Sequence, residues 1–152
     1  MLDCKKEFCS EPVKSDDTAV IKSMCTLFDA LTSRLEEVTV AKDGENARAD
    51  YLEYIEKWFV FAVIWSIGAT IEDSSRREFE NVLISIEPAM FPHSCSVYDA
   101  YVHEEKKQFS PWSDKIPQSK IDRNKSFNQI IVPTVDTTRN RYITNVLLNK
   151  NV

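Results

Sequence analysis

The chain has 152 residues, of which 43% are apolar and 28% are charged, and this is enough to form the core of one domain or of two small units. The formal net charge of −5 does not indicate broad affinity for nucleic acid. No apolar run reaches the roughly 18 residues that a membrane-spanning helix needs, so neither nucleic acid nor a membrane is an expected partner.

The first predicted element is a helix over 17–37. It follows residues 1–16, which are mostly polar and are expected to form a disordered leader. Ser15, Asp16 and Asp17 offer caps for its first turn. Apolar residues then recur mostly at steps of three and four, which is typical of an amphipathic helix. They are Val20, Ile21, Met24, Leu27, Phe28, Leu31 and Leu35.

A second helix is predicted over 47–68. In its first half Leu52, Ile55 and Phe59 share one side, and the helix is amphipathic there. Its second half is apolar all round and carries a cluster of aromatic residues. A helix of this kind is surrounded by other protein, so we expect a neighbouring domain to cover it. Gly68 is expected to end it.

A third helix is predicted to begin near Ser75, whose side chain can cap the first turn while Glu78 reaches back to complete a capping box. Pro88 and Pro92 end this helix. Its apolar stripe consists of Phe79, Val82, Leu83 and Ile86. Residues 17–87 are therefore interpreted as a small helical unit.

The pattern changes after this unit and predicts short extended segments. Alternation over 97–102 leaves one face free of charge, which indicates a short strand. A second extended segment is predicted at 109–112, and a polar loop at 117–126. The clearest strand is 127–132.

The last predicted element is a helix over 137–149. Asp136 is expected to cap it. Its apolar face consists of Tyr142, Ile143, Val146 and Leu147.

The residues predict no catalytic site and no metal site. The chain has only two glycines and no Gly-Lys-Ser or Gly-Lys-Thr, so it contains no Walker A phosphate loop. The four cysteines have no Cys-x-x-Cys spacing and are interpreted as free thiols, and the two histidines as surface residues. Arg76 and Arg77 could reach a neighbour's nucleotide, but an ion pair with Asp73 or Glu80 is the simpler interpretation.

Val132, Pro133 and Thr134 form the most informative segment. Proline ends the preceding strand because it lacks an N–H donor, and a helix cap follows. A structural interpretation explains the cap but does not explain the Pro-Thr pair. The functional alternative is that a nucleotide base lies against the backbone of this elbow between strand and helix.

Several stretches together resemble dynein heavy chains. The most specific pair is Trp65-Ser66-Ile67-Gly68 and Val132-Pro133-Thr134-Val135-Asp136-Thr137-x-Arg139. Others are residues 24–31, Arg76 with Phe79, residues 91–92, residues 97–99, and Trp112 with Pro117. The order of these stretches is similar to that found where the second and third AAA+ modules of the motor ring join. Their residues are most similar to those of an axonemal inner-arm dynein.

The resemblance implies a mainly α chain with a small α/β part, in which a helical AAA+ lid precedes the N-terminal edge of an AAA+ α/β subdomain. Residues 17–87 would be the lid of the second module, and 88–126 a linker with short strands. Residues 127–152 would be the strand and helix that begin the third module. In the family the Walker A loop comes after such a helix, so the chain would stop before it.

By the same resemblance Val132, Pro133 and Thr134 would line the adenine side of the third module's site, whose cofactor in the parent family is ATP with Mg²⁺. The chain alone is expected to bind no cofactor and to be no enzyme, because it has no Walker A or Walker B residues.

We therefore expect a non-catalytic fragment of an ATP-driven microtubule motor that couples neighbouring AAA+ modules. The implied partners are the rest of the dynein ring and other dynein subunits, with the microtubule contacted only through the parent protein. The implied location is the cytoskeleton of the cytoplasm, in the axoneme of a cilium or flagellum. The alternative is a free-standing helical module that binds another protein through its aromatic helix.

Overall fold

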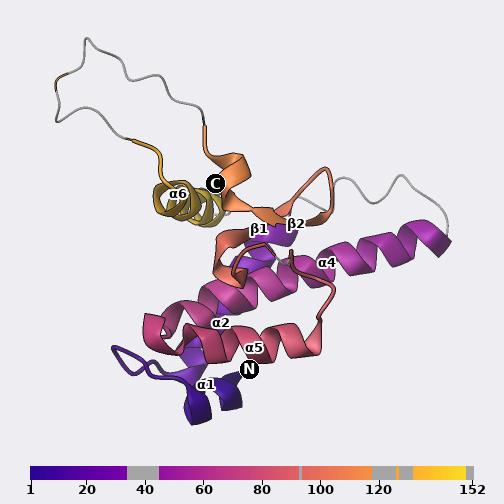
Figure 1. Cartoon of the computed structure of the whole chain (residues 1–152). Coiled ribbons are helices and arrows are strands. Elements are labelled where there is room, and N and C mark those ends of the chain that lie inside the picture. Colours follow the sequence, from indigo (N-terminus) through magenta and orange to yellow (C-terminus); the bar gives the residue numbers. More distant parts are fainter. Residues whose placement is uncertain (34–44, 93, 118–125, 127–131, 150–152) are drawn as a thin grey trace.

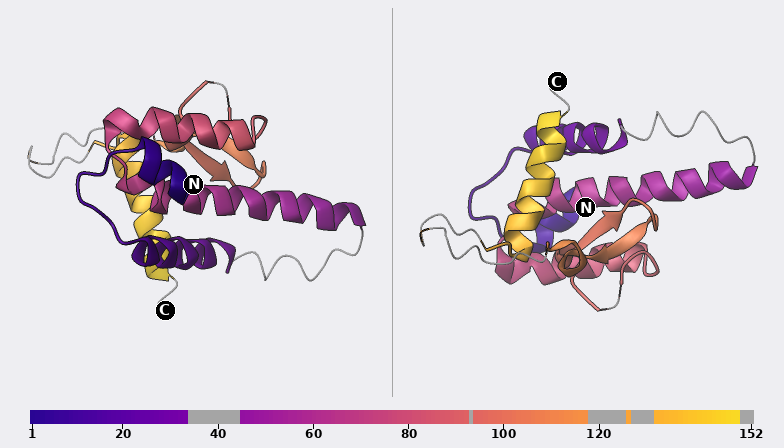
Figure 2. Two further views of the ribbon diagram at one scale, coloured as in Figure 1. Left: turned by 90° about the horizontal axis from the view of Figure 1, so that it is seen from below. Right: turned by 90° about the horizontal axis from the view of Figure 1, so that it is seen from above.

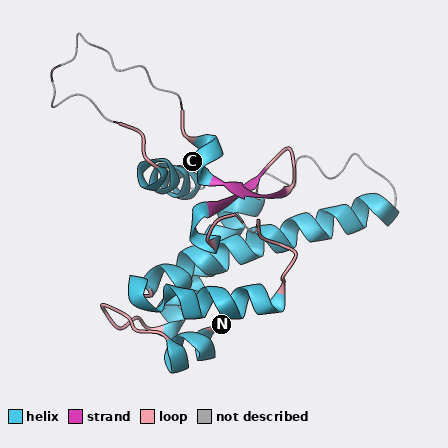
Figure 3. Ribbon diagram, viewed as in Figure 1, coloured by secondary structure: helices cyan, strands magenta, loops and turns pink. Residues whose placement is uncertain are grey.

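The computed structural model describes residues 1–33, 45–92, 94–117, 126 and 132–149, which are mainly helical with one two-stranded antiparallel sheet (Figures 1 and 3). In chain order the elements are α1 (Leu2–Phe8), α2 (Asp17–Thr32), α4 (Glu45–Ser66), α5 (Arg76–Ile86), β1 (Ala100–His103), β2 (Gln108–Pro111) and α6 (Val135–Asn149). The predicted fold class, mainly α with a small strand-containing part, is confirmed.

Helix α4 is the centre of the molecule. Helices α2 and α5 lie alongside it, α1 lies against α5, and the β1–β2 hairpin covers a further side of α4 (Figure 1). Helix α6 crosses α2 and α4 at a steep angle (Figure 2). The N-terminal half of α4 extends beyond the other described elements (Figure 1).

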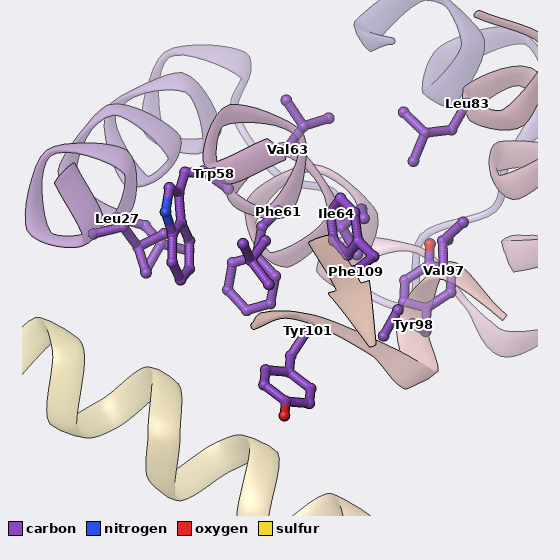
Figure 4. Packing of buried hydrophobic residues seen from close by; sticks show 14 of the residues in the cluster. Leu27, Trp58, Phe61, Val63, Ile64, Leu83, Val97, Tyr98, Tyr101 and Phe109 are labelled. Carbon is purple, nitrogen blue, oxygen red and sulfur yellow. The ribbon is translucent and has the colours of Figure 1, made fainter. Parts of the chain in front are cut away.

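One cluster of buried apolar side chains joins α2, α4, α5, the hairpin and α6. Phe61 and Ile64 of α4 are completely buried in it. Figure 4 shows Trp58 facing Leu27 of α2, and Tyr101 extending from β1 toward α6. The cover expected for this part of α4 comes from the hairpin and α6, which lie beyond the predicted helical unit at 17–87, and their assignment to a neighbouring domain stays a prediction.

The buried face of the first half of α4 differs from the prediction. Leu52 is 52% exposed and Phe59 is 44% exposed, although Phe59 makes an edge contact with Phe28 of α2. The buried side is instead lined by Tyr54 and Trp58. The two rings meet edge to face with their centres 5.8 Å apart, and both belong to the buried core cluster.

The N-terminal segment is ordered, and the predicted disordered leader at 1–16 is wrong. Lys5 of α1 is only 2% exposed, and its ammonium group pairs with the Glu11 carboxylate at 2.9 Å. The N–H of Glu72 donates to the carbonyl of Ser10 at 2.9 Å, which ties this segment to the turn before α5. Polar composition suggested disorder, but a buried lysine is tolerated where a carboxylate compensates its charge.

The caps of the first and third predicted helices differ in outcome. The Asp16 carboxylate accepts a hydrogen bond from the N–H of Ala19 at 3.0 Å, so this predicted cap of α2 is confirmed. The predicted capping box at Ser75 is wrong, because the Ser75 side chain makes no cap bond. Its hydroxyl oxygen instead accepts from the N–H of Ser10 at 3.0 Å, which fixes the N-terminal segment.

The extended segments pair as a hairpin. Ala100 lies opposite Pro111 and Val102 lies opposite Phe109, so the strand begins three residues later than predicted. The predicted start, Val97–Asp99, is a 3₁₀ turn.

Helix α6 confirms the predicted apolar face. Val146 is buried, and the other members of the face pack against the core cluster. The predicted strand 127–132 lies outside the described residues except for Val132, and so does the end of the predicted first helix beyond Ser33.

Candidate functional site

Val132, Pro133 and Thr134, the residues expected at the adenine side of a nucleotide site, lead directly into α6. Val132 is 58% exposed, Thr134 is exposed and Pro133 is half-buried. Of the three, only Pro133 lines a cavity. The structure therefore places the three residues in an open segment at the start of α6.

Thr134 rather than Asp136 caps α6, so that prediction is wrong. The Thr134 hydroxyl oxygen accepts from the N–H of Thr137 at 3.2 Å, and the N–H of Thr134 donates to the Thr137 hydroxyl oxygen at 2.8 Å. This reciprocal pair satisfies two N–H groups, as a capping box does. Asp136 lies inside the first turn, where its carboxylate binds Arg139 at 2.5 Å.

A cavity of about 530 Å³ lies against the first three turns of α6. It is within the size range of small-molecule sites. Among its described lining residues the two charged ones, Lys115 and Arg141, are cations and none is a carboxylate, although the whole chain has 24 acidic and 19 basic residues. The described residues that line it are Lys115, Pro117, Pro133, Thr137, Thr138, Arg141, Tyr142 and Asn145.

Lys115 reaches this cavity from the 3₁₀ turn after the hairpin (Trp112–Lys115). Its ammonium nitrogen is 4.1 Å from the ring centre of Tyr142 and 4.7 Å from that of Tyr101. Burial lowers the pKa of Lys115, and the charge of Glu104 partly opposes this effect. Within the described part of the chain its ammonium forms no ion pair.

Two arginines hold the starts of α5 and α6 against the core. The Arg76 guanidinium lies 4.9 Å from the ring centre of Tyr98 and pairs with Asp73 at 2.6 Å, which confirms one of the two predicted ion pairs. The Arg139 guanidinium lies 4.7 Å from the Trp65 ring centre. The Trp65 and Tyr98 rings meet edge to face at 6.1 Å. The two cations thus flank one aromatic pair, which connects α5 to α6 through α4.

Several donors in this region are buried without an acceptor among the described residues. They include the indole N–H groups of Trp65 and Trp112 and the Nε groups of Arg76 and Arg139. Both arginines use their terminal nitrogens for the ion pairs and the guanidinium face for the ring contacts. The ring contacts compensate part of this loss.

Gly68 follows α4 and does not end it, since α4 stops at Ser66 and Gly68 begins a 3₁₀ turn. A Cβ atom at Gly68 would lie 2.9 Å from Phe79 Cε1 and 2.9 Å from the Tyr98 hydroxyl oxygen. The Tyr98 hydroxyl donates to the Gly68 carbonyl at 3.2 Å. The glycine is therefore needed for close approach of the two rings.

The other candidate groups make no reactive cluster in the part of the chain that the structure describes. The four cysteines are free thiols, and burial raises the pKa of Cys9 to about 11. His103 is half-buried and stacks on Tyr101, so it is less exposed than predicted. His93 lies outside the described residues. Over the described ranges, no three metal-binding side chains form a group that could hold an ion, and no helix has the length and apolar character to cross a membrane.

Similar proteins align with nearly the whole chain. It is 36% identical to human "Dynein axonemal heavy chain 2" over 153 aligned positions, which cover 99% of this chain and 3% of that protein. It is 34% identical to the mouse protein of the same name, with the same coverage of both chains. It is 32% identical to the Chlamydomonas reinhardtii "Dynein-1-beta heavy chain, flagellar inner arm I1 complex" over 62% of this chain and 2% of that protein. The chain thus spans only a few per cent of the length of these relatives.

The family model described as "Dynein heavy chain AAA lid domain" matches residues 1–114. This range is wider than the predicted lid at 17–87 and includes α1 and the hairpin, whereas α6 lies beyond it. The exact domain boundaries remain predictions. The family match over most of the sequence and the similarity to axonemal relatives show that the chain belongs to the dynein heavy chain family and carries its AAA lid domain.

Proposed function

We propose that this chain is a non-catalytic part of a dynein motor ring that couples neighbouring AAA+ modules. The lid would move as a rigid body when its own module changes nucleotide state, and the segment through Pro88 and Pro92 and helix α6 would carry that movement to the next module. The rest of the ring and other dynein subunits would be its partners, and the microtubule would be reached only through the parent protein.

The observation that carries this proposal is the contact between Arg139 and Trp65. Trp65 belongs to α4, in the range that matches the lid, and Arg139 belongs to α6, beyond that range. Apolar packing supports the same link, because Val146 of α6 belongs to the core cluster that also contains Leu27 of α2. Helix α6 is therefore held by both a cation–ring contact and buried area, which favours joint movement over independent movement.

The nucleotide role belongs to the parent protein in this proposal. ATP with Mg²⁺ would bind the next module, with Val132, Pro133 and Thr134 on its adenine side. The tight grip on the phosphates would come from a Walker A loop, which this sequence does not contain. The chain alone would therefore not hydrolyse ATP.

The relatives' names support a location in the axoneme of a cilium or flagellum, since they are described as axonemal, ciliary or flagellar dyneins. The alternative role is a free-standing helical module that binds another protein. It is favoured by the single core, which needs no second chain to cover the second half of α4. Under this alternative, changes at Arg139 would affect stability without affecting a motor.

The test uses a dynein motor domain that carries this segment in place of its own, with Arg139→Gln as the variant. Arg77→Gln is the matched control, because Arg77 is exposed and forms no ion pair among the described residues. We expect Arg139→Gln to lower microtubule-stimulated ATP turnover and gliding speed while basal turnover stays unchanged. Unchanged stimulation and gliding in a folded variant would contradict the coupling role, and Mg²⁺-dependent ATP turnover by the isolated chain would contradict the non-catalytic role.

A further inference from the structure

We propose that the cavity on α6 is a binding site for a phosphate-type oxyanion held between Lys115 and Arg141. The site goes beyond the proposed coupling role and does not depend on it, because the two cations that would hold the anion are both described residues of this chain. The site is also different from the adenine-side site expected at Val132, Pro133 and Thr134, because only Pro133 of these three residues lines the cavity.

The charge of the wall is the first argument. Lys115 and Arg141 bring two positive charges to one cavity, and none of its described lining residues carries a carboxylate that would compensate them. Like charges at one site oppose each other, and an anion between them relieves this repulsion. The contrast with the chain as a whole, which has a net charge of −5, makes this local excess of cations specific to the cavity.

The second argument is the state of Lys115. The rings of Tyr101 and Tyr142 hold its ammonium group in place but do not neutralise its charge. Its partial burial removes water that would otherwise solvate the charge, and this lowers the pKa of Lys115. A bound oxyanion would supply the missing compensation and raise that pKa again.

Arg141 supplies the third argument. Arg76 and Arg139 each bind an aspartate three residues earlier in the chain. The residue at that spacing from Arg141 is Thr138, and Arg141 forms no ion pair with any described residue. Its guanidinium is planar and always charged, and it can bind two phosphate oxygens at once.

Neutral donors complete the wall on the same helix face. Thr138, Arg141, Tyr142 and Asn145 follow at spacings of three and four, which places them on one side of α6. A hydroxyl and an amide beside two cations are typical of sites that bind phosphate oxygens.

The wall does not favour a nucleotide base. Among the described lining residues Tyr142 alone carries an aromatic ring, and the Lys115 ammonium already lies 4.1 Å from its centre. A base could not stack on that side of the ring without displacing the lysine. The charged part of a ligand is therefore the part that the cavity recognises.

The experiment measures binding of pyrophosphate to the full 152-residue chain by calorimetry at low ionic strength, with ADP and adenosine as further probes, all without Mg²⁺. We expect pyrophosphate to bind and Lys115→Gln or Arg141→Gln to weaken it at least roughly tenfold, because each removes a charge-assisted hydrogen bond. Arg77→Gln, which removes an exposed arginine elsewhere, should leave the affinity unchanged. Added salt should weaken binding, because these charges are partly exposed.

Pyrophosphate and ADP together show whether the bound phosphate is a free ion or part of a nucleotide. ADP that competes with pyrophosphate indicates a nucleotide phosphate, and pyrophosphate that binds alone indicates the free ion; either result supports the site. The proposal is overturned if pyrophosphate does not bind at millimolar concentration, if the two variants bind as tightly as the parent chain, or if adenosine binds more tightly than pyrophosphate. Arg141 is exposed, so its variant remains informative if Lys115→Gln changes the helical circular dichroism.

A negative result here would leave the coupling role intact, because that role is read from gliding of the motor domain and not from anion binding. The reverse also holds: loss of coupling in the motor domain would not remove the cavity.

Discussion

Replacing Gly68 by alanine tests how closely α4, α5 and the hairpin approach one another. The added Cβ would lie 2.9 Å from Phe79 Cε1 and 2.9 Å from the Tyr98 hydroxyl oxygen. Neither ring has free space, since Phe79 is completely buried and Tyr98 is 6% exposed. The new methyl group must therefore displace a packed ring or the backbone of the turn that Gly68 begins.

The expected cost follows from two opposing effects. Overpacking a well-filled core costs about 1–3 kcal/mol. Replacing glycine by alanine also stabilises the folded state by about 0.4–1 kcal/mol, because alanine lowers the conformational entropy of the unfolded chain. The Tyr98 hydroxyl also donates to the Gly68 carbonyl at 3.2 Å, and a shifted ring weakens that bond. We expect a net loss of about 1–2 kcal/mol, which lowers the Tm of a domain of this size by roughly 2–8 °C.

Urea unfolding followed by tryptophan fluorescence measures this change. The control is the same substitution in a Phe79→Leu background, where the atom that meets the new Cβ is removed. There the additional cost of Gly68→Ala should fall by at least half. A stabilised Gly68→Ala protein, or an equal cost in both backgrounds, would refute the packing argument.

Three further predictions concern the ends of the chain. Arg139→Gln should lower the free energy of unfolding in urea by about 0.5–1 kcal/mol, because it removes the cation over Trp65. The same loss in a Trp65→Leu background would contradict this explanation. Thr134→Ala should lower the free energy of unfolding by about 1 kcal/mol, because it removes the helix cap. Asp136→Ala should lower it by less than about 0.5 kcal/mol, because it removes only a surface ion pair. A larger loss for Asp136→Ala than for Thr134→Ala would show that Asp136 is the cap. Burial opposes ionisation of Glu11, but hydrogen bonds from neighbouring side chains outweigh it and lower its pKa from 4.5 to about 2. Because the folded pKa is depressed, its contribution to stability is present above about pH 4.5 and is lost as the pH falls toward 2. Glu11→Gln should flatten the acid limb of a pH titration of stability, and an unchanged limb would exclude this role.

The helices could be predicted because their signals are local. The face of α6 that contains Val146 follows from its spacing alone, and the cap of α2 at Asp16 follows from residue type and position. The choice of face on α4 could not be made in this way. Both Leu52 and Tyr54 begin plausible apolar stripes, and the neighbours that decide between them come from distant parts of the chain.

The candidate site was predicted only in part for the same reason. Val132, Pro133 and Thr134 were found from a short motif, but the helix cap was assigned two residues too late, because Asp136 is also a strong capping residue. Lys115 gave no local signal. Its ring partners come from the hairpin and from α6, so only the tertiary fold identifies it as part of the cavity.

The central claim is that lid helix α4 and helix α6 move together, so that a change in one module reaches the next. It can be tested by the distance between spin labels at Phe59 and Leu148, which are exposed on α4 and α6. The measurement is made in a dynein motor domain that carries this segment, in ADP and in an ATP-like state. The account predicts the same distance distribution in both states, with Arg139→Gln broadening it. A distance that shifts with nucleotide in the unaltered segment would show that the two helices move independently and would contradict the account.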